Sequence, residues 1–552
     1  MNAVRAPVAV VGAGPVGLTL ALRLAALGID SVVLEANGRL RGEGSKALCM
    51  QRETLESWAR LGFGQQVADV GVAWTLGRTY YRDLELFETR FPEVGRDHFP
   101  PFVNVSQTEV EALMVERCEA SPYVTLCWDQ RVTGIEQTSD GVSVIAATPS
   151  GVVRVGATYA VGADGSRSTV RGLLDIGFPG HSHADQFLIA DVHADLPFPE
   201  ERRFFFDPPW NPGRTVLVHP QPGSVWRIDW QVPPEFDLAA ERASGRLDQR
   251  IRRIVGPVDY EVVWSTAYRF HQRLAERFRV DRTFLAGDAA HLMSPFGARG
   301  LNSGVADAEN LAWKLARVLS GNAPASLLDT YQAERRAAAV ENLLVTDATM
   351  RFMVPPDRAR LLARNVVLRC SRWSRWMRSQ VDSGRLSQPF VYAASPIVEP
   401  PSDEHATPSA PPNGAVALDG PCTVLSGNAG TVSRLRDLFG ADFVGLAVAA
   451  SAESALAIIR ELPSDPAVRL VCVAPAGTRA PDMGSAGSGT AVLVADEEGV
   501  LTAAYAPDGI RGAARLLVIR PDHHVAAQRD LAVPGDIAVL DSLVSFAGGG
   551  GG

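Results

Sequence analysis

The first 35 residues carry a hydrophobic pattern that predicts a β-α-β unit. A run rich in β-branched residues at 8–11 is followed by a glycine-rich turn at 12–17. Leucines then recur among alanines at 18–27, which is typical of a buried helix, and Gly28 follows. Val32, Val33 and Leu34 form a second apolar run, and Glu35 follows it. Two buried strands joined by a helix predict one unit of a parallel sheet.

Other patterns extend this prediction along the chain. Residues 76–104 and 181–268 contain alternating aromatic and β-branched strands with Pro/Gly turns, which predicts an inserted antiparallel sheet. A strand at 283–286 precedes a helix whose apolar residues recur with a period of 3.6 over 305–319. The pattern therefore predicts a return to the first, parallel sheet after the insertion.

The C-terminal third has a different organisation. Residues 326–395 continue as helices with an arginine-rich face, and this region also contains Trp373 and Trp376. Residues 396–414 are dense in Pro, Ser and acidic residues, which is typical of a linker. Strands and helices alternate again over 415–546, and this predicts a separate α/β domain.

Composition narrows the function classes. The chain has 552 residues, enough for roughly two to four domains, and its net charge of −9 argues against nucleic acid or a membrane surface as the main partner. Six cysteines without a CxxC pair predict free thiols, a cytoplasmic protein and no metal site. The uncharged run at 6–22 is interrupted by glycines and falls short of the ~20 residues of a membrane span.

The first glycine turn has the spacing of a dinucleotide site. Gly12, Gly14 and Gly17 form a GxGxxG motif between a strand and a helix, and Glu35 follows eighteen residues later. Gly12 allows a tight turn, Gly14 lets backbone amides approach a pyrophosphate, and Gly17 lets the helix pack on the strand. Glu35 can accept hydrogen bonds from ribose hydroxyls. The motif predicts a dinucleotide but does not distinguish FAD from NAD.

Two further turns combine glycine and aspartate. Asp288 follows the strand at 283–286, where a carboxylate can hold a polyol chain, and residues 295–302 lead into the next helix. The free amides at that helix start could stabilise the negative charge of a reduced flavin. Asp164-Gly165 also lies between a strand and a helix start, and alone it could be an Asx turn with an N-cap.

Together and in this order, the three motifs resemble the class A flavoprotein aromatic hydroxylases, the family of para-hydroxybenzoate hydroxylase, phenol hydroxylase and the hydroxyphenylpropionate and polyketide hydroxylases. The resemblance covers essentially the whole chain. It implies an α/β fold: a Rossmann-like FAD-binding domain, an inserted antiparallel-sheet substrate domain and a C-terminal thioredoxin-like domain. The expected boundaries are 1–75, 105–180 and 269–395 for the FAD-binding domain, 76–104 and 181–268 for the substrate domain, 396–414 for the linker, 415–546 for the thioredoxin-like domain and 547–552 for a disordered glycine tail.

The resemblance also implies the contacts with FAD. The ADP half would be bound by Gly12, Ala13, Gly14, Pro15, Val16, Gly17, Glu35 and Ala36. The flavin half would be bound by Lys46, Gln107, Asp164, Gly287, Asp288, Pro295, Gly300, Leu301 and Asn302. Asp164 belongs to a family signature that is also linked to the reducing nucleotide. The sequence departs from the family at Lys46, where arginine is usual, and at Ala298-Arg299, where many members have Gly-Gln.

The implied reaction is hydroxylation of a phenolic or polycyclic aromatic substrate, including polyketides of antibiotic biosynthesis. NADPH or NADH would reduce FAD, and O2 would then form a flavin C4a-hydroperoxide. Baeyer–Villiger-type oxygen insertion on the same fold and a non-catalytic, flavin-bound aromatic-binding protein are the alternatives. A halogenase is disfavoured because the chain has no WxWxIP segment and only two lysines. A homodimer is kept as an option.

The inserted sheet is expected to form an apolar, water-poor substrate pocket. Its aromatic residues are Phe204, Phe205, Phe206, Trp210, Trp226 and Trp230. Strand alternation can place His219 and Gln221 on one face, and it separates Arg227 and Asp229 from Trp226 and Trp230. By the resemblance, His219 and Gln221 would face substrate and Arg227 would contact flavin. A structural histidine and a solvated Arg–Asp pair remain the alternatives.

The C-terminal domain is expected to have no thiol redox role. Cys422 lacks a second cysteine three residues on, which a redox-active pair would require. A structural role or a dimer interface is the interpretation for this domain.

Overall fold

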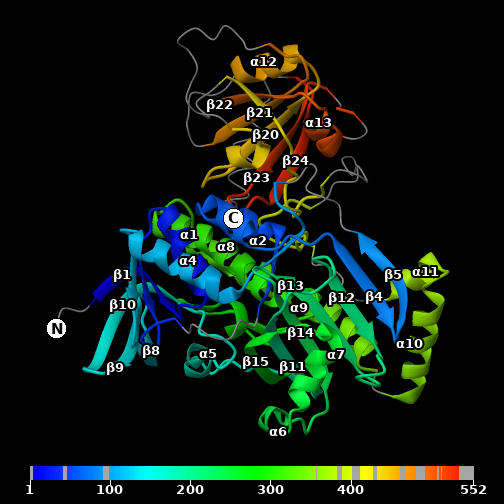
Figure 1. Ribbon diagram of the computed structural model, residues 1–552. Helices are drawn as coiled ribbons and strands as arrows, with labels where there is room; N and C mark the ends of the chain where they lie inside the picture. The colour runs from blue at the N-terminus through cyan, green and yellow to red at the C-terminus, as the bar shows by residue number, and fades with distance from the viewer. Residues whose placement is uncertain are drawn as a thin grey trace. The chain divides into compact units, whose positions relative to one another are not determined.

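The computed structural model describes residues 4–40, 47–90, 98–355, 357–381, 388–400, 411–426, 432–460, 468–479, 491–506, 509–510 and 512–533 (Figure 1). The chain divides into two compact units. The first unit comprises Met1–Glu309 and Arg336–Ser387, and the second comprises Asn310–Arg335 and Gln388–Gly552. Helices α8 (Arg299–Leu319) and α9 (Asp329–Met353) each continue from one unit into the other. Helical periodicity alone could not show this division, because it does not reveal which neighbour a helix packs against.

The predicted β-α-β unit forms the centre of the first sheet. It consists of β1 (Val4–Val11), α1 (Pro15–Ala26) and β2 (Ser31–Leu34). The sheet has the order β16-β17-β10-β1-β2-β7, with the β8–β9 hairpin on β10. Its other strands are β7 (Val124–Cys127), β8 (Arg131–Gln137), β9 (Val142–Thr148), β10 (Gly151–Gly162), β16 (Arg279–Val280) and β17 (Thr283–Leu285). Because β1, β10 and β17 are parallel, the turns that follow them meet at one edge of the sheet.

The second sheet is almost entirely antiparallel, in the order β18-β15-β11-β14-β13-β12-β4-β5. The exception is the parallel pair β12–β4. Its strands are β4 (Leu76–Tyr81), β5 (Leu84–Arg90), β11 (Gly180–His193), β12 (Arg202–Phe206), β13 (Thr215–Gln221), β14 (Val225–Val232), β15 (Glu261–Leu274) and β18 (His291–Leu292). The antiparallel insertion predicted from the sequence is therefore present.

One face of this second sheet packs against α7 (Arg246–Val255), which follows α6 (Leu238–Ala243). Trp226 and Trp230 are buried there with Leu247 and Ile251 of α7, and Phe205 and Trp210 pack against the same cluster. This corrects the expectation that all six aromatic residues line the pocket. Pleat alternation directs Phe205, Trp226 and Trp230 to the face opposite His219, and Trp210, in the turn after β12, packs on Phe205.

The other face holds Phe204 and Phe206 in a cluster with the helices α9 and α10 (Arg358–Cys370). Phe296, from the loop before α8, belongs to the same cluster. The remaining elements of the first unit are α2 (Arg52–Arg60), α3 (Gly64–Val70), α4 (Gln107–Ala120), α5 (Thr169–Leu173), α11 (Arg375–Gln380), the 3-10 helix Gly287–Ala289 and the strand pair β3 (Cys49–Gln51) and β6 (Phe102–Asn104). The loop at 295–298 is thus packed onto the same face as His219.

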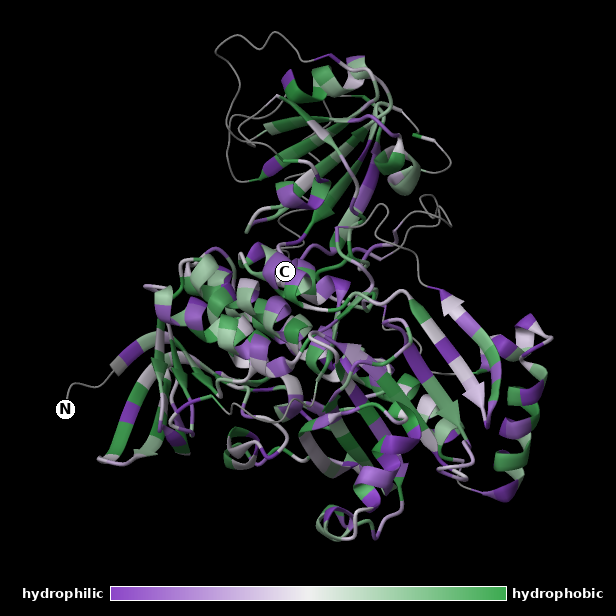
Figure 2. Cartoon of the chain, viewed as in Figure 1, coloured by the Kyte–Doolittle hydropathy of each residue, from purple (hydrophilic) through white to green (hydrophobic). Residues whose placement is uncertain are grey.

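The second unit contains a six-stranded mixed sheet in the order β19-β22-β21-β20-β23-β24. The strands are β19 (Thr423–Ser426), β20 (Val444–Ala449), β21 (Arg469–Pro475), β22 (Ala491–Asp496), β23 (Ala514–Ile519) and β24 (Val525–Leu531). Its helices are α12 (Ala452–Arg460), α13 (Val500–Tyr505) and the 3-10 helices Ala325–Leu328 and Leu435–Leu438. The strands β20–β22 are parallel and largely hydrophobic (Figure 2), as expected for strands covered on both faces.

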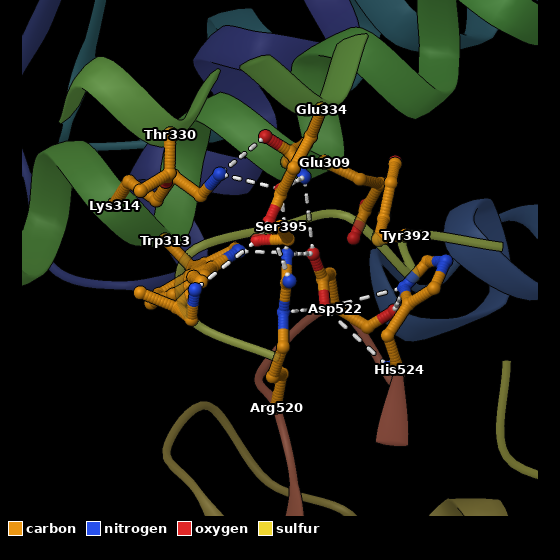
Figure 3. Close-up of polar contacts among 12 residues, drawn as sticks. Glu309, Trp313, Lys314, Thr330, Glu334, Tyr392, Ser395, Arg520, Asp522 and His524 are labelled. Atoms are coloured by element: carbon orange, nitrogen blue, oxygen red, sulfur yellow. Dashed lines mark hydrogen bonds and ion pairs between the residues drawn. The ribbon is translucent and has the colours of Figure 1, made fainter. Parts of the chain in front are cut away.

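A buried ion cluster fastens residues 310–335 to the C-terminal sheet inside the second unit (Figure 3). Glu334 accepts hydrogen bonds from Lys314 at 2.7 Å and from both terminal nitrogens of Arg520 at 2.7 and 2.9 Å. Asp522 accepts from Arg520 at 2.6 Å and from Trp313 at 3.1 Å. Each buried charge therefore has an oppositely charged partner, which buried ions require.

Candidate active site

The first glycine turn is closed tightly against the third motif. Gly12 has φ +106°, and a Cβ there would lie 2.5 Å from the carbonyl oxygen of Ala163. A Cβ on Gly17 would lie 2.1 Å from the carbonyl oxygen of Gly12. Neither position accommodates a side chain, which explains why both residues are glycine. The turn after β1 and the turn after β10 are therefore in contact.

The start of α1 offers open backbone. Its N-cap residue is Gly14, no side chain caps the helix, and a Cβ on Gly14 would meet nothing within 4 Å. Pro15 takes the first helical position, where its missing N–H costs nothing. Val16, next in the helix, packs against Gly287. The exposed amides and the helix dipole make this end suited to a phosphate group.

Glu35 lies directly after β2, and its carboxylate points back to the glycine turn. One oxygen accepts a hydrogen bond from the Ala13 amide at 2.9 Å, and the other accepts from the Asn37 amide at 2.9 Å. Ala36 lies between these contacts. Oε1 also accepts from the side-chain amide of Asn37, so Oε2, with one hydrogen bond, is the oxygen that can still accept a hydroxyl donor.

Asp164 uses its side chain to begin α5. Its Oδ2 accepts hydrogen bonds from the backbone amides of Thr169 at 2.7 Å and Val170 at 3.1 Å, and Oδ1 accepts from the hydroxyl of Ser168. Ser168 is the N-cap residue of α5 and accepts from the Arg171 amide at 3.0 Å, so Asp164 supports the helix start without being its N-cap. Gly165 has φ +79°, and a Cβ there would meet nothing within 4 Å.

The second motif packs directly on the first. A Cβ on Gly287 would lie 2.9 Å from the side chain of Val16. The carboxylate of Asp307 accepts from the Gly287 amide at 2.9 Å and contacts His291 Nε2 at 2.7 Å. Asp288 beside them is exposed. The turn is thus held from behind by buried polar groups, while Asp288 remains accessible.

Asp307 and His291 were not assigned roles from the sequence. The sequence carried one signal, because Asp307 interrupts the apolar stripe of the helix at 299–319. In the structure, the side chains of Asp307 and His291 are both fully buried. A buried carboxylate requires a partner, but the sequence could not identify that partner as the Gly287 turn.

The loop at 295–302 is fixed by the side chain of Asn302. Its oxygen accepts from the Gln51 amide at 3.0 Å and the Thr54 hydroxyl at 2.7 Å, and its nitrogen donates to the Cys49 carbonyl at 3.0 Å. Asn302 therefore joins the start of α8 to β3 and α2. Pro295 is exposed, Gly300 and Leu301 are half-buried, and a Cβ on Gly300 would meet nothing within 4 Å.

Of the predicted flavin contacts Lys46 and Gln107, only Gln107 lies among the described residues. Gln107 begins α4, accepts from the Ala47 amide at 3.2 Å and donates to Glu111 at 2.7 Å. Lys46 lies outside the described residues. Gln107 therefore positions the residue that follows Lys46 in the chain.

On the substrate sheet, Arg227 and Gln221 share one carboxylate. Arg227 donates to both oxygens of Asp191, at 2.8 and 2.7 Å, and Gln221 donates to the first of them at 2.8 Å. All three side chains are buried. The arginine is therefore held in one orientation by a bidentate pair, which is the strong geometry for guanidinium and carboxylate.

His219 and Asp229 form a second, less constrained pair on the same face. His219 Nε2 lies 3.8 Å from Asp229 Oδ2. His219 Nδ1 and Asp229 Oδ1 are buried and have no hydrogen-bond partner among the described residues. Unpartnered buried polar atoms are costly, so this pair is the place on the sheet where a polar ligand atom would be stabilised.

The environment moves the pKa of each group in the direction that disfavours charge. Burial raises the pKa of the Asp229 carboxyl to about 7, although Arg227 opposes this shift. Burial, together with Arg202 and Arg227, holds the pKa of His219 well below 6.5. Desolvation is the dominant cause in both cases. Near neutral pH, His219 is uncharged and Asp229 can gain or lose a proton.

This face is joined to the loop at 295–298 by aromatic contacts. The rings of Phe187 and Phe296 lie 5.5 Å apart, and those of Phe270 and Phe296 lie 5.8 Å apart. The ring centroids of Tyr268 and Phe270 lie 4.9 Å apart. Burial raises the pKa of the Tyr268 phenol, and the charges of Asp229 and Asp288 raise it further, while Arg227 opposes the shift. The polar pair and the exposed Asp288 are therefore brought to the same region of the first unit.

Residues 5–345 match a protein family described as "FAD binding domain". The chain belongs to this family. It is 31% identical over 367 residues to a 3-(3-hydroxy-phenyl)propionate/3-hydroxycinnamic acid hydroxylase of Mycolicibacterium smegmatis. The match covers 66% of this chain and 64% of that protein.

Solved structures agree with this fold along the whole chain. A ternary complex of aklavinone-11 hydroxylase with FAD and aklavinone has a TM-score of 0.74 and 25% identity, with 99% of each chain covered. The flavin-dependent monooxygenase PieE in complex with FAD and substrate has a TM-score of 0.78 at 20% identity, again with 99% of each chain covered. The latter likeness concerns the fold alone.

The family's cofactor fits the residues that the structure brings together. The amides at the α1 start and Glu35 would hold the pyrophosphate and ribose of FAD. Asp288, which is exposed, would bind the polyol chain, and Pro295 lies in the loop before α8. A Cβ on Gly14, Gly165 or Gly300 would meet no atom within 4 Å, so this edge of the sheet has room for a dinucleotide.

None of the described helices is both long enough and apolar enough to cross a bilayer. In the same part of the chain, no cluster of three or more His, Cys, Asp or Glu side chains is arranged to bind a metal ion.

Proposed function

We propose that this protein is an FAD-dependent, NAD(P)H-consuming monooxygenase that hydroxylates a phenolic or polycyclic aromatic substrate. The observation that carries the proposal is the joining of two sites in one unit. The edge where three glycine turns meet is suited to FAD, and the loop that follows it packs onto a sheet face with buried, unpartnered polar atoms. The hydroxylase names of the relatives support the same reaction class.

When bound and reduced by NAD(P)H, the flavin supplies the chemistry that activates O2 for transfer of one oxygen atom. The chain's own residues have separate tasks. Glu35, Asp288 and the α1 amides bind the cofactor, and Asn302 fixes the loop beside it. The aromatic cluster around Phe296 excludes water from the reacting region.

We assign the proton chemistry to His219 and Asp229. A phenol is activated for hydroxylation at its ring carbon when its hydroxyl proton is removed. A carboxylate with a pKa of about 7 is matched to accept that proton near neutral pH. His219 Nδ1, which has no partner among the described residues, would hydrogen-bond the same hydroxyl. The Arg227 guanidinium, opposite His219 in the strand register and held by Asp191, would lie beside the phenolate.

The substrate class is also part of the proposal. His219 and Asp229 remain 15% and 19% exposed, whereas Leu217 on the same face is only 2% exposed. A ligand can therefore reach the polar pair beside the apolar cluster that Phe204, Phe206 and Leu217 form on this face. A phenol with a large apolar ring system matches such a surface better than a small, strongly charged acid, and one structural relative is complexed with aklavinone.

The second unit is proposed to be a thioredoxin-like domain without redox activity. Its mixed sheet combines parallel central strands with the antiparallel hairpin β23–β24, which supports this assignment. Burial raises the pKa of the Cys422 thiol to about 12, so the thiolate needed for disulfide exchange is not formed.

A panel of phenols and polycyclic aromatics tests the reaction. NAD(P)H oxidation by the purified protein should be stimulated by its substrate, and mass spectrometry should find a product one oxygen atom heavier. Binding of an aromatic compound without stimulated oxidation or product would instead identify a binding protein.

A further inference from the structure

Helices α10 and α11 carry a surface that neither the cofactor site nor the substrate face uses. Residues 358–381 contain seven arginines and no aspartate or glutamate. Six of these arginines are exposed: Arg358, Arg360, Arg369, Arg372, Arg375 and Arg378. Four large apolar side chains are exposed among them: Leu362 (67%), Val366 (56%), Trp373 (79%) and Trp376 (66%). We call these ten residues the Arg/Trp surface.

The exposure does not come from a loosely attached helix. On the opposite side of α10, Leu368 is fully buried and Arg364 donates to the Met353 carbonyl at 2.9 Å. Val381, directly after α11, is buried in the same cluster as Leu368. The inward side chains therefore fix both helices to the first unit, and the Arg/Trp surface is left facing outward.

The charge of this surface is also unusual for the chain. The whole protein has a net charge of −9, yet no acidic residue interrupts the arginines of α10 and α11. Arg360 pairs with Asp357 at 3.6 Å, but among the described residues no ion pair involves Arg372 or Arg375, which flank Trp373 and Trp376. Cations without acidic partners, placed around exposed apolar side chains, complement an anionic surface with an apolar layer beneath it.

We propose that the Arg/Trp surface docks the protein onto an anionic membrane surface. The arginines would contact lipid phosphates, while Trp373, Trp376 and Leu362 would enter the boundary between headgroups and acyl chains, where tryptophan is favoured. A two-fold dimer through the same surface would place arginine opposite arginine, which like-charge repulsion disfavours. In Figure 2, both helices carry hydrophilic and hydrophobic residues.

Cosedimentation of the FAD-loaded protein with lipid vesicles tests this proposal. Vesicles of phosphatidylcholine with about 30 mol% phosphatidylglycerol should bind the protein at low salt, whereas vesicles of phosphatidylcholine alone should not. High salt should release it. Equal binding to both vesicle types, or binding to neither, would overturn the proposal.

Matched variants separate this surface from general charge effects. Arg372→Gln with Arg375→Gln should weaken vesicle binding about 25-fold, because each arginine near an anionic surface contributes about a fivefold change. Arg131→Gln with Arg253→Gln removes the same charge from exposed positions elsewhere and should weaken binding much less. Equal losses in both variants would contradict a localised docking surface.

The tryptophans supply an independent readout. Trp373→Ser with Trp376→Ser should reduce vesicle binding at least tenfold while leaving FAD content and NAD(P)H oxidation unchanged. Light scattering tests whether a second copy of the chain occupies the surface instead of a membrane. If the unmodified protein is a dimer and the Trp373→Ser/Trp376→Ser variant is a monomer, the Arg/Trp surface binds a second copy. Because FAD content and NAD(P)H oxidation are measured separately, a failure of vesicle binding would overturn the docking proposal and leave the proposed function unaffected.

Discussion

At the scale of single residues, the account depends most on Asp229. Asp229→Asn keeps the shape of the side chain but cannot accept a proton, so kcat should fall roughly 10²- to 10⁴-fold. In the unmodified protein, activity should rise as the pH increases through about 7, because Asp229 must lose its proton before it can act as a base. The variant should lack this rise.

The pH profile of Asp185→Asn provides the control for that prediction. Asp185 belongs to the same sheet and pairs with Arg214 at 3.2 Å. Its replacement should leave the profile in place. A profile that survives Asp229→Asn as well would assign the proton transfer to another group.

Two positions on the cofactor edge should separate folding from FAD binding. Gly12→Ala adds a Cβ that would lie 2.5 Å from a carbonyl oxygen, in a left-handed conformation, so it should lower both Tm and FAD content. Asp288→Ala changes an exposed side chain, and it should weaken FAD binding roughly 10- to 100-fold with little change in Tm. Unfolding and flavin fluorescence measure the two effects. If both variants bound FAD as tightly as the unmodified protein, the assignment of this cofactor site would be wrong.

At the scale of helices and strands, the buried ion cluster links residues 310–335 to the C-terminal sheet within the second unit. Replacing one member leaves uncompensated charge, so Glu334→Gln should cost roughly 3–5 kcal/mol of unfolding free energy. Glu136, which pairs with Arg154 at the surface, is the matched control, and Glu136→Gln should leave Tm nearly unchanged. Calorimetry of both variants checks this contrast, and similar Tm losses would contradict it.

The same cluster should make the second unit sensitive to acid. Burial alone would raise the pKa of Glu334, but Arg520 and Lys314 outweigh it and hold the pKa well below the usual 4.5. The pKa of Asp522 is lowered in the same way by Arg520 and His524. A carboxyl with a lowered folded-state pKa loses its stabilising contribution as the pH falls below its unfolded value. Tm should therefore drop below about pH 4.5, and an acid-independent Tm would contradict the pairing.

The elements formed by local sequence could be predicted, and the contacts between distant elements could not. The β1-α1-β2 unit follows from a glycine turn between two apolar runs, and all its determinants lie within 35 residues. The pairing of Asp191 with Arg227 depends instead on the register of β11 with β14, which no local pattern encodes. For the same reason, the sequence did not show that Trp226 and Trp230 face α7, or that Asp307 supports the turn at Gly287.

At the scale of the whole molecule, three glycine turns far apart in the chain lie on parallel strands of one sheet, and the fold brings them to one edge. The family match covers residues 5–345, and the chain has further residues beyond that match. The account therefore places the cofactor and the substrate in the first unit. We propose a structural role for the second unit and membrane docking for helices α10 and α11.

One measurement tests the central claim most directly: the visible spectrum of the purified protein, followed by NAD(P)H consumption in the presence of aromatic substrates. The account predicts bound, oxidised FAD, slow NAD(P)H oxidation alone, and a strong increase with a phenolic substrate that leaves as a hydroxylated product. A correctly folded protein that binds no FAD, even after reconstitution, would contradict it.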